Sequence, residues 1–211
     1  MESSEKLILL KGGEGLYEEK KSRFIATAVP VSSEEEAMNF IASTKKKYWD
    51  ARHNCSAFII GERGQLTRCS DDGEPSGTAG RPMLEVLSGA GLTNVCVVVT
   101  RYFGGTLLGT GGLVRAYTQA VKDALDNSII GRVSKGVLIE VILDYNDVGS
   151  VKYLLEKNDL DCSDVDYAAD VTMRLRIKTE AADSIEKDIT ECTAGRCLIT
   201  RIGECEIVEN I

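Results

Sequence analysis

The sequence predicts an α/β (α+β) protein of two domains, residues 1–132 and 135–211. Strand-like and helix-like hydrophobic patterns alternate along its 211 residues. The pattern restarts after a junction at Ile130–Ser134, and the second half then follows the order βαββαβ of a ferredoxin-like fold. A chain of this length can bury a sizeable core without disulfides.

The first predicted element is a strand over Tyr17–Val31, where apolar residues occupy alternate positions. A helix follows, with Ser33 as its N-cap and Glu36 completing a capping box. Lys45–Lys47 lie at the end of this helix, where the helix dipole favours cations. We therefore interpret these lysines as a solvated helix end.

Two further strands, Asn54–Ile60 and Gln65–Ser70, are expected on either side of the turn Gly61–Gly64. The next segment, Asp71–Gly80, reads DDGEPSGTAG and is rich in glycine. A helix should begin at Pro82, because proline suits the first helical turn.

A continuous β-branched run, Val95–Val99, predicts a strand buried on both faces. It leads into Arg101–Tyr117, which reads RYFGGTLLGTGGLVRAY. Beyond these glycines, apolar residues recur at helical spacing and predict an amphipathic helix. They are Leu113, Ala116, Tyr117, Ala120, Val121, Ala124 and Leu125.

The second domain repeats the alternation of strands and helices. The expected strands are Val137–Leu143, Leu160–Tyr167, Val171–Lys178 and Cys197–Val208, and the expected helices are Asp147–Asn158 and Ala181–Cys192. The outer face of the third strand carries Arg174, Arg176 and Lys178. This strand lacks the aromatic motifs with which an RRM sheet stacks bases.

The two glycine-rich loops each lead into a helix, so their backbone N–H groups should form an anion pocket at helix N-termini. Nearby arginines would add forked donors. The loops match neither a Walker A sequence nor the dinucleotide-binding pattern G-x-G-x-x-G. The candidate anion-binding or partner-binding residues are Arg81, Arg101, Tyr102, Gly104, Gly105, Gly109, Gly111, Gly112 and Arg115.

A second set of residues has two interpretations. His53 and Cys55 share a strand face and invite a nucleophile–base pair, but no third group orients the imidazole, so a histidine that bonds a loop is favoured. Asp71, Asp72 and Glu74 would suit Mg²⁺ or acid–base chemistry. A loop-ordering turn that pairs with a nearby arginine, Arg81 or Arg101, is favoured for them.

Two aromatic residues, Tyr102 and Phe103, lie at the mouth of the second glycine-rich loop. Exposed rings there would stack nucleobases. Buried rings would close the end of the strand as part of the core. The sequence leaves both interpretations open.

Together with His53-Asn54-Cys55-Ser56-Ala57, the two loop motifs resemble the signature of the YigZ/IMPACT family over Tyr17–Asn127. The resemblance implies the bacterial two-domain form. Its N-terminal domain would be like the second domain of ribosomal protein S5, and its C-terminal domain like the end domains of translocating elongation factors. Eukaryotic members carry a further domain that binds the activator of the general-control translation kinase. The resemblance therefore implies a link to translation or its regulation.

Composition narrows the function classes. The net charge is −8, yet residues 1–132 are balanced with 16 basic and 16 acidic side chains, whereas residues 133–211 hold 9 and 17. RNA binding would therefore need a local patch of positive charge, and DNA binding is not expected. The seven cysteines form no C-x-x-C pairs, so we expect reduced thiols and no metal site. No leader or long apolar run is present, so a cytoplasmic protein without a membrane partner is expected.

These observations predict a non-enzymatic binding protein whose N-terminal domain binds RNA or a ribosome-associated protein. The main alternative is a metal-assisted enzyme that acts on a small phosphorylated or nucleotide ligand through Asp71, Asp72 and Glu74. A third is a purely protein-binding regulator. No cofactor is expected, and the sequence carries no signal of oligomeric state.

Overall fold

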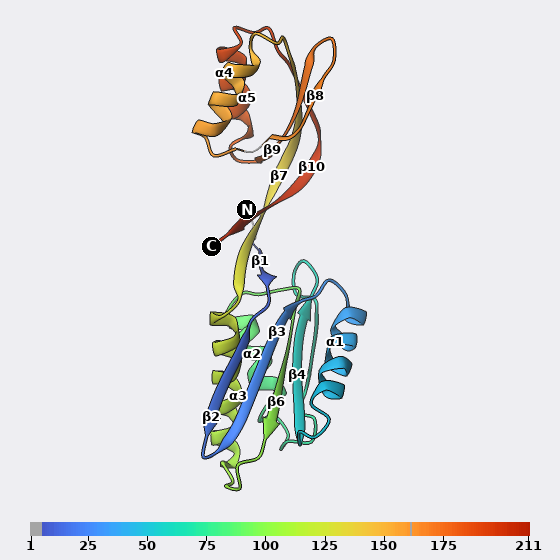
Figure 1. Cartoon of the computed structure of the whole chain (residues 1–211), viewed down its shortest axis with the longest axis vertical. Helices are drawn as coiled ribbons and strands as arrows, with labels where there is room; N and C mark the ends of the chain where they lie inside the picture. The colour runs from blue at the N-terminus through green and yellow to red at the C-terminus, as the bar shows by residue number, and fades with distance from the viewer. Residues whose placement is uncertain (1–5, 161) are drawn as a thin grey trace. The chain divides into compact units, whose positions relative to one another are not determined.

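The structure is a computed structural model that describes residues 6–160 and 162–211. The chain divides into two compact units (Figure 1). The N-terminal unit comprises Lys6–Arg132 with Glu209–Ile211, and the C-terminal unit contains Val133–Val208. No helix in the described ranges is long and apolar enough to span a membrane.

The N-terminal unit is built on a five-stranded sheet of order β2-β3-β6-β4-β5, in which every neighbouring pair is antiparallel. Its strands are β2 (Glu14–Glu19), β3 (Ser22–Pro30), β4 (His53–Ile60), β5 (Leu66–Ser70) and β6 (Val95–Tyr102). Strand β1 (Lys6–Lys11) lies outside this sheet and pairs with β7 (Ile129–Leu143).

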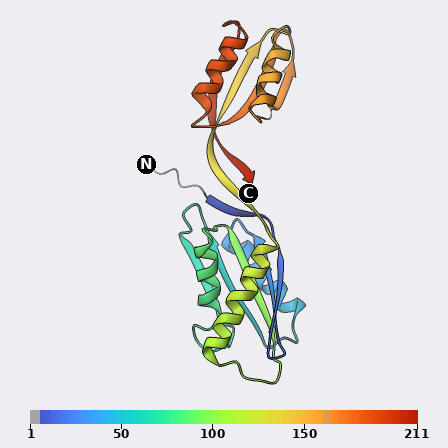
Figure 2. The same ribbon diagram turned by 90° about the vertical axis from the view of Figure 1, so that its left-hand side faces the viewer.

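Helices cover both faces of this sheet. Helices α2 (Gly80–Gly89) and α3 (Gly109–Asp126) lie on one face, and α1 (Glu34–Lys47) lies on the other (Figure 2). Strand β6 is buried on both sides, since Val97 packs in the α2/α3 core and Val98 packs in the α1 core. This confirms the two-sided burial predicted from its β-branched run.

The predicted strand Tyr17–Val31 is wrong as a single element, because β2 and β3 form a hairpin. The turn consists of Lys20 and Lys21, with φ angles of 47° and 65°. A two-residue hairpin turn of this kind normally carries asparagine, aspartate or glycine. Two lysines therefore gave no turn signal in the sequence.

Local signals placed the helices well. Ser33 Oγ accepts a hydrogen bond from the backbone N–H of Glu36, as the predicted capping box requires. The carboxylate of Glu36 in turn accepts from the N–H of Ser32 rather than from that of Ser33. All seven residues of the apolar stripe predicted for α3 are buried.

The C-terminal unit has the predicted βαββαβ order, with strands arranged β10-β7-β9-β8. Its elements after β7 are α4 (Val148–Lys157), β8 (Cys162–Tyr167), β9 (Val171–Lys178), α5 (Ala182–Cys192) and β10 (Leu198–Asn210). The inner residues of β7 and β9 pack against α4 and α5 in one core. The fold class is therefore confirmed as a two-domain mixed α/β protein.

Candidate functional site

Four segments that are distant in sequence meet around the buried side chain of Glu74. Its Oε1 lies 2.5 Å from Arg101 Nη1, at the end of β6, and accepts a hydrogen bond of 2.8 Å from the Tyr117 hydroxyl on α3. His53 Nε2, at the start of β4, lies 3.9 Å away. The network joins both glycine-rich motifs to the β4 motif inside the N-terminal unit.

The thiol of Cys55 belongs to the same network. Its Sγ lies 3.0 Å from the backbone carbonyl oxygen of Asp71 and 3.3 Å from the Tyr117 hydroxyl, and its single proton can be donated to either oxygen. Burial raises the pKa of the Cys55 thiol to about 12. The imidazole of His53 is directed elsewhere, with Nδ1 lying 2.9 Å from the carbonyl of Asp72. Cys55 is thus a buried, protonated thiol, which does not suit a nucleophile.

The two adjacent aspartates order the first glycine-rich loop. The Asp71 carboxylate accepts from the backbone N–H groups of Gly77, Ala79 and Gly80 at 2.8 to 3.0 Å. The Asp72 carboxylate accepts from the N–H of Asn54 and pairs with Lys45 at 2.5 Å.

The pKa values of both aspartates reflect these contacts. Burial raises the pKa of Asp71, but its backbone N–H donors outweigh this and hold the pKa below its usual range. Burial also raises the pKa of Asp72, but Lys45 and the N–H of Asn54 outweigh this effect, so the pKa lies below its usual range. Within the described residues, no group of three or more His, Cys, Asp or Glu side chains is placed to hold a metal.

The three candidate arginines lie in different surroundings. Arg101 is only 6% exposed and is paired with Glu74, while its Nε has no hydrogen-bond partner among the described residues. Arg81 is exposed on α2 and pairs with Glu85 at 3.0 Å. Arg115 is exposed on α3 and lines a groove of about 610 Å³ with Tyr17. Of the two arginines nearest the second loop, Arg101 is therefore held inside by Glu74, and Arg115 is the one exposed at the surface.

The second glycine-rich loop has a different character from the first. Gly104 donates its N–H to Ser22 Oγ at 3.1 Å and packs so tightly that a Cβ would lie 2.1 Å from the Lys21 carbonyl carbon. Gly105 and Gly109 have φ angles of 87° and 70°, which glycine adopts readily. Among the described residues, no acceptor is bonded to the backbone N–H groups of residues 105–108.

The start of α3 continues this row of free donors. Its N-cap, Leu108, provides no side-chain hydrogen bond. The first N–H groups of a helix have no partner within it, and here they include those of Gly109 and Gly111. Gly112 lies half-buried in the same turn. The loop therefore has backbone N–H groups available for an anion, with Arg115 one turn further along.

The aromatic residues at the loop mouth have separate roles. Tyr102 is half-buried, and its hydroxyl donates to Asp50 Oδ1 at 2.8 Å. Phe103 is 41% exposed. Sequence reasoning missed Trp49, the only tryptophan of the chain, which is 82% exposed in the turn after α1. Its position two residues after a run of three lysines was the available signal.

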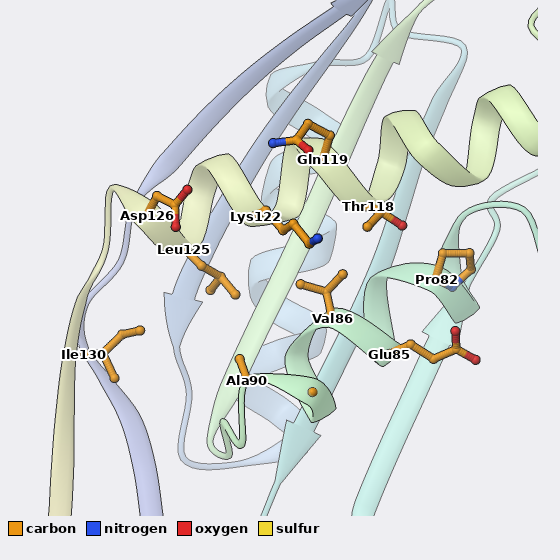
Figure 3. A pocket seen from close by; sticks show the side chains of 11 residues that line it. Pro82, Glu85, Val86, Ala90, Thr118, Gln119, Lys122, Leu125, Asp126 and Ile130 are labelled. Carbon is orange, nitrogen blue, oxygen red and sulfur yellow. The ribbon is translucent and has the colours of Figure 1, made fainter.

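An adjoining groove of about 650 Å³ lies between α2 and α3 and shares Thr118, Gln119 and Lys122 with the groove beside Arg115. Figure 3 shows Val86, Ala90, Leu125 and Ile130 along it, with Lys122 reaching between the two helices. None of the predicted site residues lines this groove.

Each of the two units matches a known domain family. The model of the Impact N-terminal domain matches residues 20–125, and a domain of unknown function, DUF1949, matches residues 141–196. The chain is 40% identical over 192 residues to IMPACT family member YvyE of Bacillus subtilis, covering 90% of this chain and 87% of that protein. It is 35% identical to IMPACT family member YigZ of Escherichia coli, covering 88% and 92%.

The chain is also similar to a eukaryotic protein and to a protein of known crystal structure. Protein IMPACT of Mus musculus is 35% identical over 96 residues, covering 43% of this chain and 30% of that protein. A crystal structure described as that of a hypothetical protein has a TM-score of 0.60 and 34% identity, covering 94% of this chain and 97% of that one.

Proposed function

Because the chain belongs to the IMPACT family, we propose that it is a non-enzymatic binding protein linked to translation or its regulation, and that its N-terminal unit binds RNA. One observation supports RNA most directly: the backbone N–H groups from Gly105 to Gly111 lie at an exposed helix start beside Arg115. Backbone donors and a guanidinium at such a place suit phosphate oxygens.

Arg115 is well placed to bind a ligand. Among the residues that the structure describes, it has no ion-pair partner, unlike Arg81 and Arg101. Lys122 lines the same groove two turns along α3 and is likewise unpaired within the described chain. The two cations would therefore neutralise phosphates along one side of the helix.

The enzymatic alternative requires carboxylates that are free to bind a metal or move a proton. Asp71 instead accepts three backbone hydrogen bonds, Asp72 is held by Lys45, and Glu74 is paired with Arg101. These contacts favour a structural role for all three side chains. They leave the binding function as the better proposal.

The test measures the affinity of the whole chain for RNA oligonucleotides at several salt concentrations. Each phosphate contact to a single strand should contribute about −0.7 to the log-log slope. Replacing Arg115 with alanine should weaken binding for all sequences and make the slope shallower by somewhat less than one unit. Arg63→Ala is the matched control, because Arg63 is exposed in the turn after β4, away from the start of α3, and has no ion-pair partner among the described residues.

If the parent protein shows no salt-dependent RNA binding, the RNA proposal fails, and a ribosome-associated protein becomes the better candidate partner. If Arg115→Ala and Arg63→Ala lose the same amount of RNA affinity, the binding surface does not include the start of α3.

A further inference from the structure

Two exposed aromatic rings lie in neighbouring segments at one end of the N-terminal sheet. Trp49, 82% exposed, is in the turn between α1 and β4, and Phe103, 41% exposed, directly follows β6. Both segments lie at the end of the sheet where β4 begins and β6 ends (Figure 1). A tryptophan so far from the core forgoes the large gain that burying its ring would bring.

The turn that presents Trp49 is held in place. The N–H of Ala51 donates to the carbonyl of Tyr48 at 3.0 Å, and the Tyr102 hydroxyl donates to Asp50 at 2.8 Å. Asp50 and Tyr102 are the immediate neighbours of the two exposed rings. Their hydrogen bond therefore ties the two aromatic segments together before any ligand binds.

A cation lies beside one of these rings, and two more are close to Trp49 in the sequence. The Arg52 guanidinium carbon lies 6.0 Å from the centroid of the Phe103 ring. Lys46, Lys47 and Arg52 are exposed, and within the described parts of the chain none of them has an ion-pair partner. The carboxylate of Asp50 already accepts from Tyr102. A hydrogen bond from a neutral hydroxyl leaves the negative charge of Asp50 in place, so residues 46–52 carry three cations and one anion, a net charge of +2.

We propose, on the premise that the N-terminal unit binds RNA, that Trp49 and Phe103 form a stacking platform for unpaired nucleobases. Aromatic rings bordered by cations are the combination that single-stranded nucleic acids require, since bases stack on the rings while phosphates meet the cations. Arg52 also offers a guanidinium plane on which a base can stack. The ligand is then RNA with a single-stranded segment, not a continuous duplex.

Trp49 reports on this contact directly, because it is the only tryptophan in the chain. The native protein is titrated with an oligouridylate of ten nucleotides, an abasic oligomer of equal length and charge, and a ten-base-pair RNA duplex. Stacking predicts saturable quenching of the tryptophan emission by oligouridylate alone. The abasic oligomer should bind more weakly and leave the emission nearly unchanged.

Variants separate stacking from charge. Trp49→Ala and Phe103→Ala should each weaken oligouridylate binding by about 5-fold to 100-fold, with nearly the same salt slope and little change for the abasic oligomer. Because Trp49 is exposed, its loss should leave thermal unfolding unchanged. Tyr153→Ala is the control, since Tyr153 is 71% exposed on α4 in the other unit.

Equal quenching by the abasic oligomer would overturn the platform, as would full oligouridylate affinity in the Trp49→Ala, Phe103→Ala double variant. In either case, salt-dependent binding of the duplex or oligomer would leave the proposed RNA-binding function standing. If none of the three RNAs binds, both the function and the platform are refuted.

Discussion

Glu74 Oε1 and Arg101 Nη1 lie 2.5 Å apart, and their side chains are only 3% and 7% exposed. The two residues are 27 positions apart, in the first glycine-rich loop and at the end of β6. Burying two charges is costly unless each has a partner, so each side chain depends on the other. This pair ties the loop to the sheet.

The first prediction concerns that pair. Replacing Glu74 with glutamine leaves the Arg101 guanidinium buried without a counter-charge, and the free energy of unfolding should fall by about 3 to 5 kcal/mol. Urea unfolding monitored by circular dichroism measures the loss. Glu85→Gln breaks the exposed pair with Arg81 and should cost about 0 to 1 kcal/mol. Similar losses in the two variants would contradict a structural role for the buried pair.

The second prediction concerns acid. The folded-state pKa values of Asp71 and Asp72 are lowered, so both carboxylates stabilise the fold fully above their unfolded pKa of about 3.9. That stabilisation is lost as the pH falls from about 4 through the lower folded-state values. Unfolding free energies measured from pH 7 to pH 3 should decline steeply at the acid end.

Asp71→Asn separates this contribution from those of other carboxylates. The variant should be less stable than the parent at pH 7, because the amide is a weaker acceptor for three backbone N–H groups. The difference between the two proteins should shrink below pH 4. A constant difference at every pH would show that Asp71 does not contribute through its charge.

The third prediction concerns the glycines of the second loop. A Cβ at Gly104 would lie 2.1 Å from the Lys21 carbonyl carbon, so Gly104→Ala must displace backbone and should cost about 1 to 3 kcal/mol or more. Gly111→Ala is the matched control, because its nearest contact would be Arg115 Nη1 at 3.9 Å. Alanine in that helical turn should be neutral or stabilise by up to about 1 kcal/mol. Thermal unfolding of the two variants compares them, and an equal effect would argue against the close approach.

The fourth prediction concerns thiol reactivity. Burial raises the pKa values of Cys55 and Cys96 to about 12, so neither should react with iodoacetamide in the native protein at pH 8. Cys69 and Cys192 are both exposed, but burial raises the pKa of the Cys192 thiol, so Cys69 should be alkylated first. Mass spectrometry of peptides from native and urea-treated protein locates the label. Rapid labelling of Cys55 in the native protein would contradict this and support the interpretation of Cys55 as a nucleophile with His53 as its base.

Local sequence signals were sufficient for most elements. The apolar stripe of α3 and the cap at Ser33 depend on residues within a few positions of one another, and both were predicted correctly. The β2–β3 hairpin was missed because Lys20 and Lys21 adopt left-handed angles that lysine rarely takes.

The candidate site was harder to predict, because its contacts cross long stretches of chain. The sequence suggested two roles for Arg101, a ligand-binding arginine and a partner for the acidic residues of the first loop, and the structure has the second, since Glu74 pairs with it. The glycine pattern did locate an exposed loop with available N–H groups. Trp49 was missed because the preceding lysines were read only as a helix end, and exposure of a ring depends on the tertiary packing around it.

Substitutions at Glu74, Arg101, Tyr117 and Cys55 cannot be selected independently, because these side chains are linked through one buried network. Selection for a foldable domain is enough to keep the two loop motifs together as lineages diverge. Proteins that share those motifs can therefore differ in what they bind. Changes of ligand during evolution should instead accumulate at exposed positions such as Lys46, Trp49 and Phe103, where folding constrains the choice of side chain less.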